Sequence, residues 1–566
     1  MKAVFSTFVF LFFWKTLSVF GQAPLSEYYK KQWSSLAPGT RVSFGNANVH
    51  DPIDRVPTTS MSDIWRISAW RGETVHTKVL IWSTDSLPDI RCKVSNLISL
   101  SGKRIEKAEI QARFLRYVKT DGYFGNGCNP RKNSQLDSSL VADLIDTVSF
   151  VSVAPRTVQP IWLSIHVPEN TSAGRYQGYV TVYTSKPYRL RVDLQVLPHA
   201  LPSLATQSFR LDLWQYPVSI ARVHNVTLWS DDHFSFMRPY YELLAAAGQR
   251  TITTTIVEGG NQNKEVSPAM IRTVRRSDGS WSYDYSLFDR YVSFVMECGI
   301  KEYIHCFTLV PWSGDLGFFD EAKGRDSVFH TTAQSEEFRN YWRPFLQDFA
   351  KHLKAKNWFN RTRLAMDERK VPDMLAAIEL ARQTDPDWQI ALAGSYHPEL
   401  IEMVQDYSIY RSSVFSDKDL DFRRKNGYTS TFYTSCEGEH PNMFTFSPPA
   451  ESVWIGWLAA AKGMDGYLRW AYNLWPKYPE MDSRGPFPAG DMFLVYPGPK
   501  SSVRFEKLKE GIQDFGKIKI LLQNSKRGRQ HANVPKLIQF LKSMENEWLD
   551  THPADEILQQ AKKLLN

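Results

Sequence analysis

The stretch "TRLAMDERKVPDMLAAIELARQTDPDWQIALAGS", residues 362–395, contains a complete strand–helix–strand unit. A short apolar run ends at two adjacent acids, Asp367 and Glu368, and the segment after them has the apolar spacing of a helix. The run "QIALAGS" then has the pattern of a second buried strand. Because a helical crossover returns the chain to the same end of a sheet, the two strands are expected to be parallel.

The same alternation of strand and helix extends from about residue 207 to residue 525. Eight segments are expected to be strands, namely residues 209–214, 251–257, 302–311, 362–368, 389–395, 408–415, 429–435 and 466–475. The sixth, "SIYRSSVF", is weak and lacks a clear helix after it, whereas "PELIEMVQDY" after the fifth is expected to be helical. Eight such units predict a (β/α)₈ TIM-like barrel with an irregular sixth unit.

The residues before the barrel have the pattern of a β domain. Segments such as "TKVLIWST" and "YRLRVDLQVLP" are rich in β-branched and aromatic residues, and the second alternates apolar and polar positions. Sheets with one buried face pack naturally as a sandwich. The prolines of "LPHALPSLATQS" mark its end. We therefore predict a β-sandwich at residues 22–203, the barrel at 204–525, and C-terminal helices packed on the barrel at 526–566.

The N-terminus has the pattern of a secretion signal. Lys2 precedes the apolar run "AVFSTFVFLFFW", which is too short to span a bilayer. We predict a signal peptide at residues 1–21, and because no cysteine follows the apolar run, no lipid anchor. The expected location is the periplasm or the medium. No later segment has the pattern of a membrane helix, so stable membrane insertion is not expected.

Composition excludes several classes of function. Lysine and arginine exceed aspartate and glutamate by 8, but the basic residues are scattered and no nucleic-acid motif accompanies them. The 5 cysteines lack metal-ligand spacing, so we expect neither a metal nor a cofactor. A disulfide between Cys92 and Cys128 is one possibility in an oxidising compartment. Aromatic residues make up 13% of the chain, which suits a sugar-binding cleft as well as a large core.

Position separates the three Asp-Glu pairs of the sequence. Asp320-Glu321 is expected in a glycine-containing loop, and Asp555-Glu556 in the first turn of a tail helix, where acids favour the helix dipole. Only Asp367-Glu368 ends a barrel strand, and active sites of such barrels lie at the carboxyl ends of the strands. We therefore predict that Asp367 and Glu368 are catalytic.

Polar and aromatic residues follow the other strands at the same end of the barrel. The candidate substrate-binding residues are Tyr396, His397, Tyr433, Trp470, Tyr472, Asn473, Trp475 and Asp491. Of the two tryptophans after the eighth strand, Trp475 is preferred as the sugar contact because it lies further along the chain. A rim with two acids and several aromatic residues favours a sugar, and no glycine-rich phosphate loop is present.

These segments resemble glycoside hydrolase family 123. The resemblance lies in "LAMDE", "PIWLSIHVPENTSAGRYQGYVTV", "LDLWQYP", and the block "GYLRWAYNLW…GDMFLVYPG…SSVRFEKLKEGIQDF", and covers roughly residues 60 to 525. It implies an N-terminal β-sandwich, a (β/α)₈ catalytic barrel and a retaining β-N-acetylgalactosaminidase activity. The catalytic acids of the family correspond to Asp367 and Glu368.

The resemblance also implies substrate-assisted catalysis on a glycan or glycolipid with a terminal 2-acetamido sugar. The acetamido oxygen would attack the anomeric carbon, Asp367 would stabilise the oxazolinium intermediate, and Glu368 would be the acid and base. Two alternatives stay open at this point. One is a hexosaminidase for β-GlcNAc or a sulfated hexosamine, and the other is a non-catalytic glycan-binding protein. The oligomeric state is not predicted.

Overall fold

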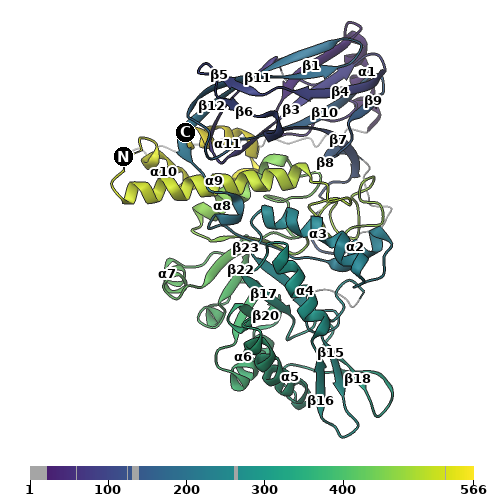
Figure 1. Ribbon diagram of the computed structural model, residues 1–566, viewed down its shortest axis with the longest axis vertical. Coiled ribbons are helices and arrows are strands. Elements are labelled where there is room, and N and C mark those ends of the chain that lie inside the picture. Colours follow the sequence, from purple (N-terminus) through teal and green to yellow (C-terminus); the bar gives the residue numbers. More distant parts are fainter. Residues whose placement is uncertain are drawn as a thin grey trace, which may run out of the picture.

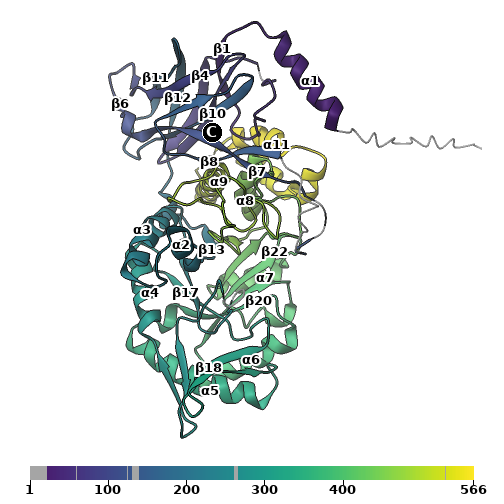
Figure 2. The same ribbon diagram turned by 90° about the vertical axis from the view of Figure 1, so that its right-hand side faces the viewer.

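A computed structural model of the chain describes residues 22–566 except residues 59, 124, 126, 130–138, 261–264 and 530. The predicted signal peptide, residues 1–21, lies outside the described residues. The described chain opens with helix α1 (Gln22–Ser35), which was not predicted and extends away from the body of the molecule (Figure 2). The C-terminal end of α1 contacts the sandwich through Trp33, whose indole donates to the carbonyl of Asp54 over 2.7 Å.

The N-terminal domain is the predicted β-sandwich (Figure 1). One sheet has the order β1 (Thr40–Gly45), β3 (Thr74–Ser83), β10 (Thr157–His166), β7 (Ile110–Thr120) and β8 (Ser139–Ile145). The other has the order β2 (Ile64–Arg71), β12 (Pro187–Ala200), β11 (Gly174–Tyr183), β4 (Leu87–Val94) and β9 (Phe150–Val153), with β5 (Leu97–Ser99) paired to β11 and β6 (Arg104–Ile105) paired to β5. Apolar residues from the facing sides of both sheets form one core.

All eight predicted barrel strands are present, and adjacent strands pair in parallel. Their order is β13 (Arg210–Leu213), β24 (Gly466–Arg469), β23 (Thr429–Tyr433), β22 (Asp406–Tyr410), β21 (Gln389–Gly394), β20 (Thr362–Asp367), β17 (Tyr303–Phe307) and β14 (Thr251–Thr255). From β14 to β24 the strands are arranged around the barrel in the order of the sequence. Strand β13 closes the barrel between β24 and β14. The barrel fold is therefore confirmed.

Two glutamine side chains span the seam between β13 and β14, where no continuous backbone ladder forms. The Gln249 amide oxygen accepts from the Leu213 N–H over 2.8 Å, and its amide nitrogen donates to the Thr251 carbonyl over 2.7 Å. The Gln215 amide oxygen accepts from the Thr253 N–H over 2.9 Å. Both side chains are buried. Side-chain amides thus satisfy backbone groups that would otherwise be orphaned at the seam.

Helices cover the outside of the barrel (Figure 1). They are α2 (Pro217–His224), α3 (Asp231–Ala246), α4 (Ser286–Glu297), α5 (Glu336–Ala355), α6 (Val371–Thr384), α7 (Asp417–Lys425), α8 (Pro449–Ala461) and α9 (Val503–Lys526).

The fifth and sixth units differ from the prediction. After β21 the expected helix is replaced by a single 3₁₀ turn, Pro398–Leu400, because β22 begins only a few residues later. After β22, helix α7 forms where none was expected. Its sequence, DKDLDFRRK, is too polar for apolar periodicity, but Ser416 caps the Asp419 N–H, and acids at the start with bases at the end complement the helix dipole.

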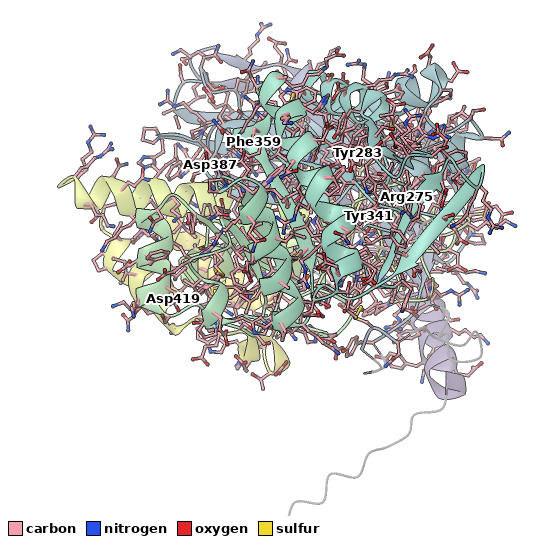
Figure 3. The ribbon with its side chains drawn as sticks, turned by 90° about the horizontal axis from the view of Figure 1, so that it is seen from below. Arg275, Tyr283, Tyr341, Phe359, Asp387 and Asp419 are labelled. Atoms are coloured by element: carbon pink, nitrogen blue, oxygen red, sulfur yellow. A yellow bond between two sulfur atoms is a disulfide. The ribbon has the colours of Figure 1, made fainter. Side chains whose placement is uncertain are left out.

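A four-stranded sheet that the sequence did not reveal projects from the carboxyl end of the barrel (Figure 1). It consists of β16 (Trp281–Asp284), β15 (Arg272–Arg275), β18 (Asp315–Asp320) and β19 (Arg325–His330). In the view from below, Arg275 and Tyr283 of this sheet and Tyr341 of α5 are labelled in the same region (Figure 3), and the Trp281 ring of β16 packs edge-to-face on Tyr341. The pair Asp320-Glu321 therefore belongs to the β18–β19 turn and not to a loop of the barrel rim.

The C-terminal tail forms α10 (Val534–Ser543) and α11 (Ala554–Ala561), which pack on α8 and α9 as expected. The tail also contacts the sandwich. The Asp555 carboxylate accepts from the Asn46 and Asn48 amides over 2.7 and 2.5 Å, and the Trp70 indole donates to the Leu565 carbonyl over 3.1 Å. The tail therefore joins the two domains.

In the ranges that the structure describes, no helix combines the length and the apolar character needed to cross a membrane.

The seam predicts a stability effect. Replacing Gln249 by Met leaves the buried Leu213 N–H and Thr251 carbonyl without these partners, and each buried unsatisfied group costs about 1–3 kcal/mol. We expect Gln249→Met to lower the free energy of unfolding by at least about 2 kcal/mol in denaturant titrations. Gln523→Met, on the exposed face of α9, is the control and should change little. Equal stabilities of the two variants would contradict the role given to the seam.

Candidate active site

Asp367 and Glu368 lie side by side at the carboxyl end of β20. Asp367 is the last residue of the strand, and Glu368 adopts a left-handed backbone with φ of 43°. The Glu368 N–H donates to the Ala393 carbonyl at the end of β21 over 2.8 Å. Successive residues of a strand point to opposite sides, but this turn brings both side chains into one cavity of about 450 Å³.

The wall of this cavity is largely aromatic. Its aromatic lining residues are Trp214, Trp312, Tyr433, Trp470 and Phe487. They come from the ends of barrel strands and from the loops that follow them. A carboxylate pair on a floor of large flat side chains can hold the apolar face of a sugar ring while it exchanges protons with its substituents.

Burial and charge shift the acidity of Asp367. Burial, followed by the charge of Glu368, raises the pKa of Asp367 to about 7, while Arg369 and a hydrogen bond from Trp312 oppose the shift. Near neutral pH, Asp367 therefore exists in both protonation states. A cationic group bound beside it would favour the carboxylate.

Arg369 and Trp312 pack against each other next to Asp367. The Arg369 guanidinium lies 3.7 Å from the centre of the Trp312 ring and donates to the carbonyls of Val310 and Asp367. Burial lowers the pKa of Arg369 to about 10, so the group stays cationic. Trp312 is 54% exposed even though it lines the cavity. It is thus held from behind by a cation and open to a ligand in front.

Tyr433 orients Glu368. The buried Tyr433 hydroxyl, at the end of β23, donates to Oε1 of Glu368. Burial and the charge of Glu368 raise the pKa of Tyr433, which keeps the phenol protonated and donating. Tyr433 was predicted to contact the substrate, and the structure places it in the cavity wall and in contact with Glu368.

Trp470 lines the cavity and is fixed by Asp491. The Trp470 indole donates to Oδ2 of Asp491 over 3.1 Å, and Oδ1 of Asp491 lies 2.7 Å from the Arg469 guanidinium. Asp491 is fully buried and is not among the lining residues of the cavity. Of the two predicted contacts, Trp470 therefore lies in the cavity, whereas Asp491 lies behind it.

The preference for Trp475 over Trp470 is wrong for this cavity. Strand β24 ends at Arg469, so Trp470 is the first residue at the rim and Trp475 lies in the core, where its indole donates to the Val495 carbonyl over 2.6 Å. Two other predicted residues are also buried. The Tyr472 hydroxyl donates to the Tyr240 carbonyl, and the Asn473 side chain bonds both backbone groups of Tyr216.

The two candidates after β21 also lie outside the main cavity. The Tyr396 hydroxyl donates to Asp419 of α7 over 2.7 Å and packs edge-on against Phe415. His397 lines a smaller adjoining cavity of about 280 Å³, which Glu368 and Tyr433 also border. His397 therefore lies near Glu368 but is not among the residues that line the main cavity.

Several lining residues of the cavity were not among the candidates from the sequence, including Cys128, Trp312, Glu437 and Phe487. Trp312 sits in "LVPWSGD" directly after the third strand, so its place after a barrel strand was a usable signal. Phe487 and Glu437 lie in long loops after strands 8 and 7, and Cys128 comes from the N-terminal domain. No local pattern indicates that such segments reach the rim.

The disulfide considered between Cys92 and Cys128 does not form. Cys128 is bonded to Cys436, which follows β23 of the barrel, whereas Cys92 is a free cysteine on β4 of the sandwich. The loop that carries Cys128 leaves the sandwich and reaches the barrel rim. The N-terminal domain therefore supplies part of the wall around the two acids.

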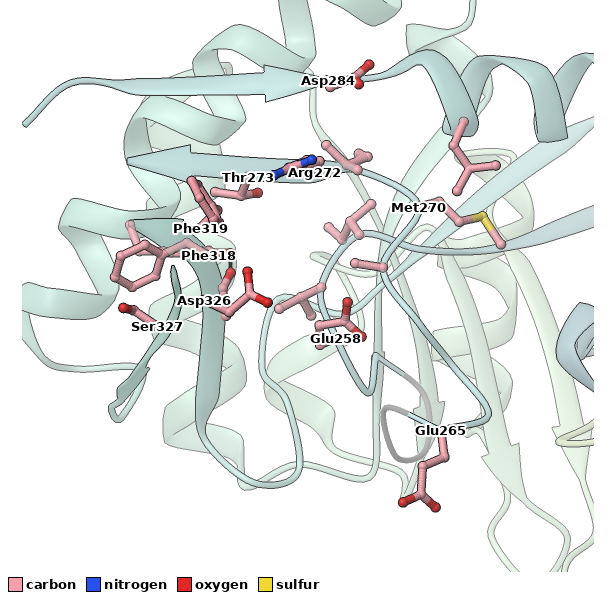
Figure 4. A pocket seen from close by; sticks show the side chains of 17 residues that line it. Glu258, Glu265, Met270, Arg272, Thr273, Asp284, Phe318, Phe319, Asp326 and Ser327 are labelled. Atoms are coloured by element: carbon pink, nitrogen blue, oxygen red, sulfur yellow. Dashed lines mark hydrogen bonds between the residues drawn. The ribbon is translucent and has the colours of Figure 1, made fainter. Parts of the chain in front are cut away.

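A larger cavity of about 740 Å³ lies between the four-stranded sheet and the barrel (Figure 4). Its carboxylates come from separate elements, with Asp284 ending β16, Asp326 on β19, and Glu258 and Glu265 in the loop after β14. It contains no adjacent acid pair at a strand end. Among the described residues, no group of three or more histidine, cysteine or acidic side chains is arranged to hold a metal ion.

Comparisons with known proteins agree with this geometry. A family model for "Glycoside hydrolase 123, catalytic domain" matches residues 214–521, and one for "Glycoside hydrolase 123 N-terminal domain" matches residues 44–184. A solved family 123 glycoside hydrolase from Clostridium perfringens, studied for glycolipid glycan hydrolysis, is 25% identical with a TM-score of 0.84, and the match covers 93% of this chain and 98% of that one.

A second structure, a GH39 β-xylosidase from Caulobacter crescentus, is 16% identical over 55% of this chain and 72% of that one, with a TM-score of 0.34. No curated protein matches the chain.

The charges around Asp367 predict its titration. Carboxyl carbon NMR, assigned by the signal lost in Asp367→Asn, should give a midpoint of about 7. Arg369→Gln removes a stabilising cation and should raise the pKa of Asp367, whereas Glu368→Gln removes a repelling anion and should lower it. Lys370→Gln, one residue along, is the charge-matched control. A pKa of Asp367 near its ordinary value, or unaltered by Arg369→Gln, would contradict this account.

Proposed function

Because this chain belongs to glycoside hydrolase family 123, we propose that it removes terminal β-linked N-acetylgalactosamine from glycans or glycolipids, with retention of configuration. The observation that carries the proposal is the placement of Asp367 and Glu368 in one aromatic-walled cavity at the carboxyl ends of the barrel strands. Because the two acids are neighbours in sequence, we assign the role of nucleophile to the 2-acetamido group of the substrate.

The first chemical step follows from the roles of the two acids. In an ordinary retaining glycosidase, a second carboxylate about 5–5.5 Å from the acid attacks the sugar. Here the 2-acetamido oxygen attacks the anomeric carbon as the glycosidic bond breaks, and protonated Glu368 gives its proton to the departing oxygen. The product is a bound oxazolinium and a free aglycone.

Asp367 stabilises the oxazolinium through its N–H. The raised pKa of Asp367 means that the free enzyme holds a proton there part of the time near neutral pH. The developing positive charge of the oxazolinium favours the ionised carboxylate, so the interaction strengthens as the reaction proceeds. A low-dielectric, partly closed cavity increases that stabilisation.

The second step regenerates the enzyme. Glu368, now a carboxylate, removes a proton from a water molecule that attacks the anomeric carbon, and the oxazolinium ring opens to the acetamide. Two displacements at the same carbon give net retention. Tyr433 donates to Glu368 and so fixes the position of the group that transfers both protons.

The nature of the glycan is supported by the relative from Clostridium perfringens, which was studied for glycolipid glycan hydrolysis. The match to a catalytic domain argues against a non-catalytic glycan-binding protein. GlcNAc differs from GalNAc only in the orientation of O4, so an assay is the best way to distinguish the two substrates.

We also propose that the protein is exported. The apolar N-terminal segment supports this, and so does the Cys128–Cys436 disulfide, because disulfides persist mainly in oxidising compartments.

The choice of sugar is tested with aryl glycosides. We expect 4-nitrophenyl β-GalNAc to be hydrolysed with a higher kcat/KM than 4-nitrophenyl β-GlcNAc. The matching aryl β-galactoside, which has a hydroxyl in place of the acetamide, should not turn over because its nucleophile is missing. Faster hydrolysis of the GlcNAc substrate would replace the proposed sugar, and turnover of the galactoside would refute the substrate-assisted mechanism.

The acid role of Glu368 is tested by varying the leaving group. Glu368→Gln should lower kcat/KM on an unactivated disaccharide by about 10²–10⁴-fold, the usual range for general acid catalysis. Its effect on a 4-nitrophenyl glycoside should be much smaller, because that leaving group departs without a proton. Asp367→Asn should impair both substrates. If Glu368→Gln impaired both substrates to the same degree, Glu368 would not be the acid.

A further inference from the structure

Glu437 is an acid of the catalytic cavity that the proposed mechanism does not use. It lines the main cavity together with Asp367 and Glu368, and it also borders the adjoining cavity that contains His397. Its side chain is exposed and makes no hydrogen bond or ion pair with any residue of the described ranges. Burial is the main cause of the raised pKa of Tyr433, and the charges of Glu368, Asp367 and Glu437 add to it. Glu437 therefore lies near the same phenol as the two acids.

The backbone around this free carboxylate is held at several points. The Asn442 amide donates to the carbonyls of Ser435 and Gly438 over 2.8 and 2.6 Å. Asn442 is itself fixed, since its amide oxygen accepts from Arg469 over 2.9 Å and its N–H donates to Glu451 over 2.9 Å.

Two of the restraints come from the N-terminal sandwich. Cys128 is bonded to Cys436, one residue before Glu437, and the Tyr123 hydroxyl donates to the Glu437 carbonyl over 2.6 Å. The Tyr123 ring stacks on Phe444 of the barrel with an interplanar angle of 17°. The sandwich thus fixes Glu437 from one side.

Arg411 restrains the segment from the other side. It packs against Gly438 so closely that a Cβ at that position would lie 2.3 Å from its guanidinium nitrogen. A larger residue at position 438 would force the Arg411 side chain to move away from this segment. A restrained backbone that presents to a cavity a carboxylate with no partner among the described residues is the arrangement expected of a preorganised ligand group.

We propose that Glu437 is a substrate-binding residue that accepts hydrogen bonds from hydroxyl groups of the terminal sugar, and that the β-sandwich positions it. A carboxylate is an acceptor only, with two oxygens that suit neighbouring hydroxyl donors. Hydrogen bonds to a charged acceptor are stronger than neutral ones, so Glu437 contributes to specificity as well as to affinity. The inference rests on the proposed function for a sugar substrate but not on the choice between GalNAc and GlcNAc.

The contact is tested by changing the enzyme and the sugar together. Aryl glycosides of whichever hexosamine the wild type hydrolyses are prepared with fluorine in place of the 3-, 4- or 6-hydroxyl, because fluorine cannot donate. We expect Glu437→Ala to lower kcat/KM on the parent glycoside by about tenfold or more, mainly through KM. On at least one fluorinated glycoside, Glu437→Ala should cause no further loss. Glu439→Gln, two residues along and outside the cavity, is the control and should behave as wild type.

The role of the sandwich is tested in the same assay. Tyr123→Phe removes only the hydroxyl that holds the Glu437 carbonyl and keeps the stack on Phe444. It should raise KM in the wild-type background and have no effect in the Glu437→Ala background, since the two changes then act on one contact.

The outcomes separate the hypotheses. Equal losses from Glu437→Ala on the parent and on all three fluorinated glycosides would overturn the contact, and additive effects of the two variants would overturn the positioning by the sandwich. Failure of the wild type to hydrolyse any hexosamine glycoside would instead overturn the proposed function, and this inference with it.

Discussion

The convergence of Asp367 and Glu368 on one cavity depends on one backbone turn. Glu368 has a left-handed conformation, with φ of 43°, that is unfavourable for a residue with a side chain, and a single hydrogen bond from its N–H to the Ala393 carbonyl holds it. Without that turn, Asp367 and Glu368 would point to opposite sides of β20. The neighbouring strand β21 therefore converts two adjacent acids into a convergent pair, and the remainder of the barrel keeps β20 and β21 in register.

The features that the sequence predicts well are those encoded locally. The eight barrel strands have short apolar runs, and Asp367-Glu368 could be separated from the other two Asp-Glu pairs because it alone ends such a run. The sandwich strands were recognised from their alternation. These patterns reflect burial on one or both faces of a sheet, which acts on each segment separately.

Features that depend on contacts between distant segments were not predictable. Helix α7 is specified by its cap and its charges rather than by an apolar face, and Trp470 was ranked below Trp475 because the end of β24 was placed too late. Cys128 and Cys436 are separated by 308 positions, so nothing in the sequence indicates that they meet. Part of the cavity wall was missed for the same reason, since long loops bring Glu437 and Phe487 to the rim and the N-terminal domain brings Cys128.

The contacts of the C-terminal tail bear on how the chain matures. Asn46, Asn48 and Trp70 of the first domain find their hydrogen-bond partners at Asp555 and Leu565. While the polypeptide is being synthesised, the sandwich can form its own sheets early, but these side chains have no partner until residues 555–565 have emerged. These contacts between the two domains therefore form late, and until then the indole N–H of Trp70 lacks its native partner.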